Sequence, residues 1–225
     1  MGTLACTPSL TDEIQEAKDQ GRLPRVHPNG FLQLDLRPDP AGERIARRRL
    51  HIFDDRLPRQ SVRTSIHDHI FDMSSFVVKG TVLNDTYLAV PDPEGDLEIY
   101  QAQEAKCTET NLVPTGRRCT LRLKHTEYVY MGESYTFPAL AFHDSRHEGV
   151  TVTIMSKMGT VKATPRVLVP VDAEPDNSFS REDQDIDALW ELIEETFHFE
   201  LRRKPIKYFP PGWNNTGHGS DGEGQ

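Results

Sequence analysis

The sequence predicts an all-β protein with flanking helices, organised around an antiparallel barrel or sandwich. Between about residues 48 and 171, short segments rich in Val, Leu, Thr and Tyr alternate with turn signals, as is typical of such folds. Helical periodicity occurs only near the two ends of the chain, over residues 11–20 and 185–201. The 225 residues are enough for one domain with appendages and a sizeable core.

The pattern divides the chain into four parts. Residues 1–47 are expected to form an N-terminal extension with a helix and a strand, and residues 48–171 to form the barrel. Residues 172–209 are expected to contain a linker and then a helix, and the tail, residues 210–225, is rich in Gly and Asn and expected to be disordered.

Individual strands are predicted from period-two alternation and from the turn residues between them. Residues 31–36 alternate between apolar and polar side chains, and the Pro-Asp-Pro-Glu-Gly sequence that begins at Pro91 predicts a strong turn. Gly80 is expected to turn the chain between two strands of a hairpin. The expected strands span residues 31–36, 50–53, 61–69, 74–79, 81–90, 97–102, 119–131, 135–137, 149–155 and 160–171.

Two helices are expected to flank the strands. The first begins near Thr11, a suitable N-cap, and ends before Gly21. The second is amphipathic and is therefore expected to pack on the barrel or on a partner. Its apolar side chains recur at helical spacing: Ile186, Leu189, Trp190, Ile193 and Phe197.

The charge of the chain argues against two classes of partner. A formal net charge of −9 at pH 7 disfavours both nucleic acid and an anionic membrane surface. One basic cluster, Arg44 with residues 47–49, runs against this balance and could bind an anionic partner. A solvated edge is the simpler interpretation of that cluster.

Targeting signals and cysteine usage point to the cytoplasm. No window approaches the roughly 18 consecutive apolar residues of a membrane-spanning helix, and the N-terminal residues lack the pattern of a signal peptide. The three cysteines, Cys6, Cys107 and Cys119, form no dense disulfide framework and fit a reducing compartment.

The strongest chemical signal is a pair of histidines, His67 and His69, two residues apart. In a β-strand, residues i and i+2 point to the same face, so the two imidazoles are expected to enter one space. Two converging imidazoles make two thirds of a three-ligand metal site, and His143 is the best candidate for the third ligand.

Two spaced motifs around these histidines resemble those of the cupin superfamily. The second cupin motif is matched by Gly132, Pro138 and His143 at the family spacing, whereas Leu140 replaces its second Gly and His147 its Asn. The resemblance covers roughly residues 50–160 and implies a cupin-type antiparallel β-barrel, or jelly roll.

The first cupin motif is matched less completely. His67, His69 and Gly80 occupy motif positions, Met73 stands where the family has a metal-binding Glu, and Ser61 replaces the opening Gly. The resemblance therefore implies a neutral three-histidine site, as in thiol dioxygenases such as cysteine dioxygenase. Iron(II) is the expected metal, and manganese, nickel and zinc also suit imidazole ligands.

Other residues near the motifs are weaker candidates for the metal. Asp72 lies one residue before the position of the family Glu, on the opposite strand face from Met73 unless a β-bulge intervenes. His125 and His147 are further candidates for metal ligands, and each is more simply interpreted as a supporting or surface residue.

Substrate-binding and catalytic candidates follow from strand alternation and from the motifs. Arg63 shares a strand face with the histidine pair and could bind a substrate carboxylate, and Met73 is expected beside the substrate. Tyr128, Tyr130 and Tyr135 lie near the second motif, where one of them could donate a hydrogen bond to oxygen. Barrel packing is the alternative role for each tyrosine.

The predicted function is that of a mononuclear non-haem iron(II) oxygenase, with a small polar molecule and dioxygen as partners. The substrate could be a thiol or a carboxylate, since a neutral triad leaves the metal its full charge. Two alternatives stay open: a non-catalytic cupin that binds a small molecule, and a metal-dependent isomerase or lyase. Homodimerisation through sheet edges is a further expectation that the family resemblance brings.

Overall fold

A computed structural model describes residues 9–37, 48–58, 66–106, 109–173 and 184–198. The described helices are α1 (Leu10–Asp19) and α2 (Ile186–Phe197). The described strands are β1 (Arg25–His27), β2 (Phe31–Arg37), β3 (Arg48–Phe53), β4 (Phe71–Pro91), β5 (Leu97–Lys106), β6 (Glu109–Tyr130), β7 (Ser134–Phe137), β8 (Phe142–Thr160) and β9 (Arg166–Pro170).

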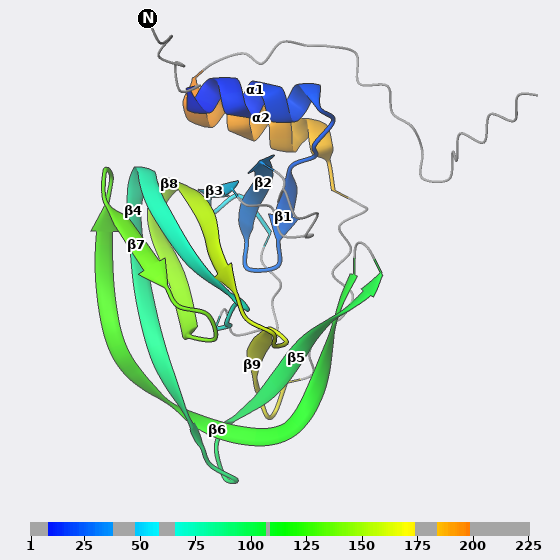
Figure 1. Cartoon of the computed structure of the whole chain (residues 1–225), viewed down its shortest axis with the longest axis vertical. Coiled ribbons are helices and arrows are strands. Elements are labelled where there is room, and N and C mark those ends of the chain that lie inside the picture. The colour runs from blue at the N-terminus through cyan, green and yellow to red at the C-terminus, as the bar shows by residue number, and fades with distance from the viewer. Residues whose placement is uncertain (1–8, 38–47, 59–65, 107–108, 174–183, 199–225) are drawn as a thin grey trace, which may run out of the picture.

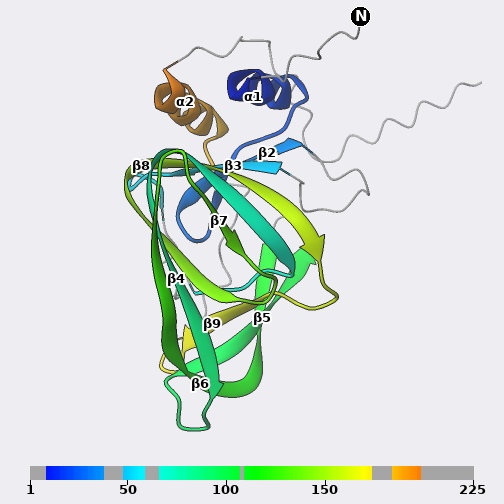
Figure 2. The ribbon, with the colours of Figure 1, turned by 60° about the vertical axis from the view of Figure 1, so that its left-hand side comes forward.

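The strands form one antiparallel sheet that curls strongly (Figure 1). Its order is β1-β2-β3-β8-β4-β6-β5-β9, and β7 pairs with β4 outside this path. Both helices lie side by side above β2 and β3, at one end of the sheet (Figure 2). The all-β architecture with flanking helices that the sequence predicts is therefore confirmed.

The residues around His67 close the lower half of the sheet into a ring. His67 forms one isolated bridge with His143 at the start of β8 and another with Val167 on β9. Because β9 continues through β5, β6 and β4 back to β8, these bridges complete a barrel. The predicted strand over residues 61–69 is thus reduced, within its described part, to an irregular segment with a single bridge position.

Strand β4 differs from the prediction at Gly80. Instead of turning, the chain continues as one strand through Gly80, whose φ is 78°, and the register with β8 shifts between Lys79 and Thr81. A glycine at positive φ permits this irregularity within a continuous strand. The expected hairpin at this point is therefore wrong, and one long bent strand crosses the barrel.

Side-chain contacts fix the N-terminal end of helix α1. Ser9, rather than the expected Thr11, is its N-cap and forms a capping box with Asp12. The buried Glu13 carboxylate accepts a hydrogen bond from Arg37 at 2.8 Å and lies 3.3 Å from Arg48. These contacts attach α1 to β2 and β3.

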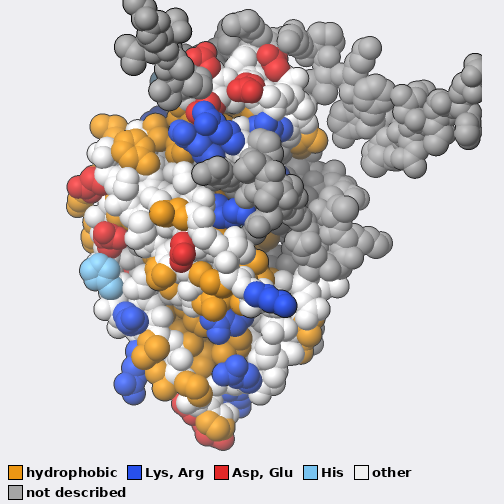
Figure 3. Space-filling model, in the orientation of Figure 1, with side chains coloured by type: hydrophobic (Ala, Val, Ile, Leu, Met, Phe, Trp, Pro, Cys, Tyr) orange, Lys and Arg blue, Asp and Glu red, His pale blue; other side chains and the backbone are white. Residues whose placement is uncertain are grey.

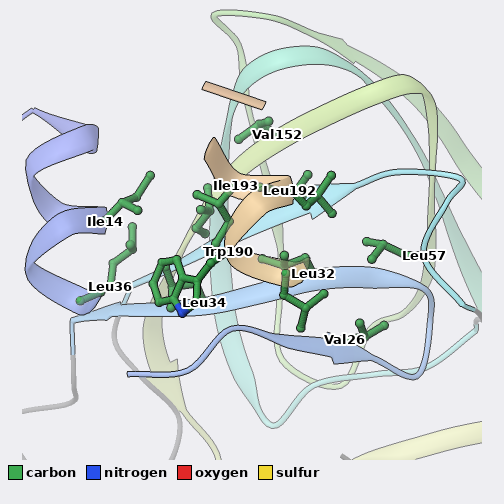
Figure 4. Close-up of a cluster of buried hydrophobic side chains, with 14 of the residues drawn as sticks. Ile14, Val26, Leu32, Leu34, Leu36, Leu57, Val152, Trp190, Leu192 and Ile193 are labelled. Atoms are coloured by element: carbon green, nitrogen blue, oxygen red, sulfur yellow. The ribbon is translucent and has the colours of Figure 1, made fainter. Parts of the chain in front are cut away.

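Helix α2 buries its apolar face in a core shared with α1 and with β2, β3 and β8. In Figure 4, Trp190 and Ile193 project from α2 into the cluster of buried side chains that also contains Leu34 and Val152. Lys18 of α1 also lies over the Trp190 ring, 5.0 Å from its centroid. The sequence predicted that this helix packs either on the barrel or on a partner, and the structure shows it packed on the sheet.

Several predicted features lie outside the described residues. They include Arg63, the basic residues Arg44 and Arg47, the expected linker after residue 174 and the tail from residue 210. Among the described helices, none combines the length and apolar character needed to cross a membrane.

Candidate metal centre

The histidine pair lies on the segment that closes the barrel. His67 and His143 exchange backbone hydrogen bonds of 3.1 and 3.0 Å, so the two residues stand directly opposite each other. Leu140 donates to the His69 carbonyl at 2.7 Å, and Asp68 donates to the Arg166 carbonyl at 3.0 Å. The segment is therefore held on one side by residues 140–143 and on the other by β9.

Asp68, between the two histidines, anchors the segment on the side facing away from the triad. Its side chain is buried, and its carboxylate accepts from the backbone N–H and from Nε of Arg166, both at 2.6 Å. Since alternate residues point to opposite sides, this anchor directs His67 and His69 the other way, into the barrel. Arg166 also donates to the Leu140 carbonyl at 3.2 Å, which joins the anchor to the loop before His143.

Three imidazoles converge on one point. One ligand atom from each of His67, His69 and His143 lies within 4.8 Å of the other two. Nitrogens that share one ion at about 2.1 Å lie at most about 4.2 Å apart, so the group is close to a metal-binding arrangement. The rings are positioned by aromatic packing: His143 stacks on Phe137 at 4.0 Å and His69 on Phe71 at 4.9 Å.

The protonation states suit metal binding. Burial, with a smaller effect of His67, lowers the pKa of His143 to about 3, and burial with the neighbouring histidines holds the pKa of His69 well below its ordinary value. Both rings are therefore neutral at pH 7 and offer a lone pair. His143 Nδ1 lies 3.0 Å from the Ala141 carbonyl, which can only accept a hydrogen bond, so Nδ1 carries the proton. The lone pair that can bind a metal is therefore on Nε2.

The triad opens into a small cavity. About 70 Å³ of free space lies in its interior, enough for a few waters, since one water needs roughly 10–15 Å³ by this measure. The lining residues are His27, Asn29, Phe31, Gln33, Arg49, His51, Phe53, His67, His69, Phe71, Met73, Tyr135, His143, Asp144, Ser145 and Met155. Without side-chain movement, the site therefore accommodates only a small molecule.

A polar group on β2 and β3 forms another part of the cavity wall. Arg49 Nε donates to Asp35 at 2.9 Å, and Arg25 Nη2 lies 3.2 Å from the same carboxylate. With its amide oxygen toward the guanidiniums, Gln33 accepts from Arg49 at 2.8 Å and from Arg25 at 3.1 Å. Two guanidinium groups thus share one carboxylate, and Arg49 and Gln33 reach the cavity.

His51 lies between this polar group and the aromatic side chains. Burial, followed by the Arg49 charge, lowers the pKa of His51 to about 3, so the ring is neutral. It packs against Phe31 at 4.8 Å and edge-on against Phe53 at 6.4 Å. The cavity therefore has one face of imidazoles and aromatic rings and a second face that carries the Arg49 guanidinium. Asp144 is the acidic residue among its described lining residues.

The predicted site residues fall into three groups. Met73 and Tyr135 line the cavity beside the triad, and burial raises the pKa of the Tyr135 hydroxyl. Tyr128 and Tyr130 are 52% and 55% exposed and lie away from the cavity. Arg63 lies outside the described residues.

The weaker ligand candidates lie outside the triad. The exposed Asp72 accepts from the Ala139 N–H at 2.8 Å. His125 is exposed, and His147 Nδ1 lies 2.8 Å from the Gly149 carbonyl. Among the described residues, the group able to hold an ion consists of His67, His69 and His143, and it includes none of these weaker candidates.

Sequence reasoning missed the polar wall of the cavity. Arg49 belongs to the basic cluster interpreted above as a solvated edge, but its side chain is only 13% exposed. Period-two alternation with His51 and Phe53 was the available signal, since all three face the cavity. The pairing of β3 with residues 151–156 of β8, which places Arg49 beside the cavity residue Met155, was not visible in the sequence.

Comparisons with known proteins assign no family. No protein-family model matches the chain, and no curated protein sequence matches it. Similar solved structures include Drosophila melanogaster CENP-C bound to CAL1, with 12% identity, a TM-score of 0.32, and coverage of 66% of this chain and 94% of that chain.

Two enzyme structures are also similar. Hydroquinone 1,2-dioxygenase PnpCD in complex with Cd2+ and 4-hydroxybenzonitrile has 11% identity and a TM-score of 0.26, and the match covers 52% of this chain and 61% of that chain. An oxalate decarboxylase variant from Bacillus subtilis has 12% identity and a TM-score of 0.32, with 89% and 39% covered. Likenesses of this size assign no activity to the chain.

Proposed function

We propose that this protein is a metal-dependent cupin, and specifically a mononuclear non-haem iron(II) oxygenase acting on a small polar molecule. The observation that carries the proposal is the convergence of His67, His69 and His143 at one end of a small cavity. Iron(II) held on one face by three neutral ligands would supply open coordination positions for substrate and dioxygen.

The charge of the triad favours an anionic substrate. Neutral imidazoles leave a divalent ion its full positive charge, and Met73 stands where the family resemblance expects a carboxylate ligand. A thiolate, enolate or carboxylate group would therefore be attracted to the metal. The limited free space favours a molecule of a few heavy atoms.

The polar wall supplies a second point of attachment. Arg49 and Gln33 line the same cavity as the triad, and Arg49 offers planar donors suited to a carboxylate. A substrate with two polar ends would be oriented between Arg49 and the metal. Asp35, which already binds Arg49 at 2.9 Å, fixes the guanidinium for this role.

Tyr135 and Met73 would complete the reaction chamber. Tyr135 lines the cavity, and its buried hydroxyl, whose pKa is raised by burial, stays protonated at neutral pH and interacts with Ser75 and Thr153. Met73, which is 6% exposed, contributes an apolar surface that keeps bulk water away. Of the three candidate tyrosines, the proposal therefore retains Tyr135.

The test is the metal content of untagged protein purified without added metal, measured by mass spectrometry. We expect about one iron per chain, from the single three-ligand group. His143→Ala should lose the metal and any oxygen uptake. His125→Ala, which removes an exposed histidine outside the triad, is the matched control and should retain both.

The other outcomes separate the alternatives. Full iron content in His143→Ala would refute the ligand assignment. Zinc or nickel alone, without oxygen uptake after reconstitution with iron, would favour an isomerase or lyase. If neither protein binds metal even on reconstitution, the non-catalytic small-molecule-binding module becomes the better interpretation.

A further inference from the structure

A second groove lies in the lower barrel, on the side of Asp68 and Arg166 and distinct from the cavity of the triad. It holds about 280 Å³ of free space, close to the lower limit of roughly 300 Å³ for ligand pockets. Barrel mouths are frequent ligand sites. The lining residues are Tyr87, Leu88, Ala89, Pro91, Ile99, Arg117, Arg118, Cys119, Lys124, Leu140, Ala141, Phe142 and Arg166.

The charge of this groove is opposite to that of the chain. Among its described lining residues four are basic and none is acidic, although the chain carries a net charge of −9. Two of the four are already engaged: Arg118 Nε donates to the Gly95 carbonyl at 2.9 Å, and Arg166 holds Asp68. Arg117 and Lys124 are exposed, with side chains at the groove.

The floor of the groove is apolar. Ile99, Cys119 and Phe142 are almost completely buried and belong to the core of the lower barrel. In Figure 3, the lower half of the molecule carries hydrophobic side chains with Lys and Arg side chains among them. The groove therefore combines an apolar base with a cationic rim.

A β-bulge places Lys124 at this rim. Leu123 pairs with Tyr87 and His125 pairs with Thr86, so Lys124 is the extra residue of β6 without a partner position on β4. Bulges re-aim side chains and are over-represented next to functional sites.

We infer that this groove binds a small amphipathic carboxylate. An alkyl or aryl tail would lie on Ile99 and Phe142, where its burial is favourable, and the carboxylate would lie between Arg117 and Lys124. The volume restricts the tail to about the size of a medium-length chain. This inference is independent of the metal at the triad.

The test is calorimetric titration with decanoate at about 150 mM salt, which screens distant charges beyond roughly 8 Å. We expect saturable binding of one decanoate per chain. Arg117→Glu and Lys124→Glu should each weaken binding roughly tenfold or more. Lys79→Glu makes the same charge change at an exposed residue beside α2, at the other end of the sheet, and should change affinity less than about twofold.

Two further measurements locate the ligand. Decanol has the same tail without the charge and should bind at least roughly tenfold more weakly than decanoate. The variant His69→Ala should leave decanoate binding unchanged, because His69 lines the other cavity. The inference would be overturned by equal binding of decanol or by an equal loss of affinity in Lys79→Glu. It would also be overturned by a loss of binding in His69→Ala, or by no binding at all. If a glutamate variant fails to fold, Lys124→Gln makes the same test without charge reversal.

Discussion

Leu140 adopts a backbone conformation that the sequence alone would not assign to leucine. Its φ is 65°, in the left-handed region that glycine favours. The position is the one where the cupin motif has its second Gly, three residues before His143. The backbone therefore adopts a conformation typical of glycine at this position, although the side chain is that of leucine.

This conformation predicts an unusual order of stability for two variants. Leu140→Gly and Leu140→Ala both remove a partly exposed side chain, but only alanine keeps a Cβ that is strained at positive φ. Leu140→Gly should therefore be the more stable by about 1 kcal/mol, whereas in an ordinary strand the order is reversed. Denaturant unfolding of the two variants measures the difference, and a more stable alanine variant would contradict the left-handed assignment.

At the scale of a single element, strand β4 depends on Gly80. A Cβ built at this residue would lie 2.3 Å from Thr151 Oγ1 and 2.9 Å from the Val150 carbonyl oxygen. Thr151 is completely buried, so neither strand can easily give way. The irregularity that lets β4 bend past β8 thus requires both positive φ and the absence of a side chain.

Gly80→Ala is therefore expected to reduce the free energy of unfolding by about 2–4 kcal/mol. Gly116→Ala is the control, because Gly116 has a similar φ of 70° with no atom within 4 Å of an added Cβ. That variant should lose only about 1 kcal/mol, from backbone strain alone. Equal losses measured by denaturant unfolding would show that the contact with Thr151 costs nothing.

For the molecule as a whole, local sequence patterns predicted the helices and strands better than they predicted which strands pair with each other. Alternation identified β2, β3 and β5, and helical spacing identified α2, because side-chain periodicity is a local property. The convergence of His67 and His69 also followed from local geometry, although the segment is not a regular strand. The ring closure through His67 depends on distant pairings with β8 and β9, which no short stretch encodes.

The same limit explains the part of the candidate site that was missed. Arg49 and His51 reach the cavity because β3 pairs with β8. In the sequence, Arg49 stands among other arginines and resembles a solvated edge. Its carboxylate partner, Asp35, lies on a neighbouring strand, and its burial becomes evident only when the sheet is assembled.

The buried neutral histidines contribute to the pH dependence of the stability of the whole molecule. His51 and His143 have a pKa of about 3 in the folded protein and about 6.5 in an unfolded chain. Between these values the unfolded state binds more protons, so the free energy of unfolding falls as pH decreases from 6.5 toward 3. Each such histidine contributes a slope of about 1.4 kcal/mol per pH unit.

His51→Leu isolates one of these contributions. We expect the slope of unfolding free energy against pH, measured by denaturant titration between pH 6 and 4 with a chelator present, to fall by about 1.4 kcal/mol per pH unit. Ile52→Val, which changes a buried neighbour on β3 without removing a titratable group, should leave the slope unchanged. The carboxylates of Asp54 and Asp85, whose pKa values are lowered in the folded state, contribute to every curve alike and cancel in the comparison. An unchanged slope in His51→Leu would mean that His51 titrates normally and that the polar wall of the cavity is open to water.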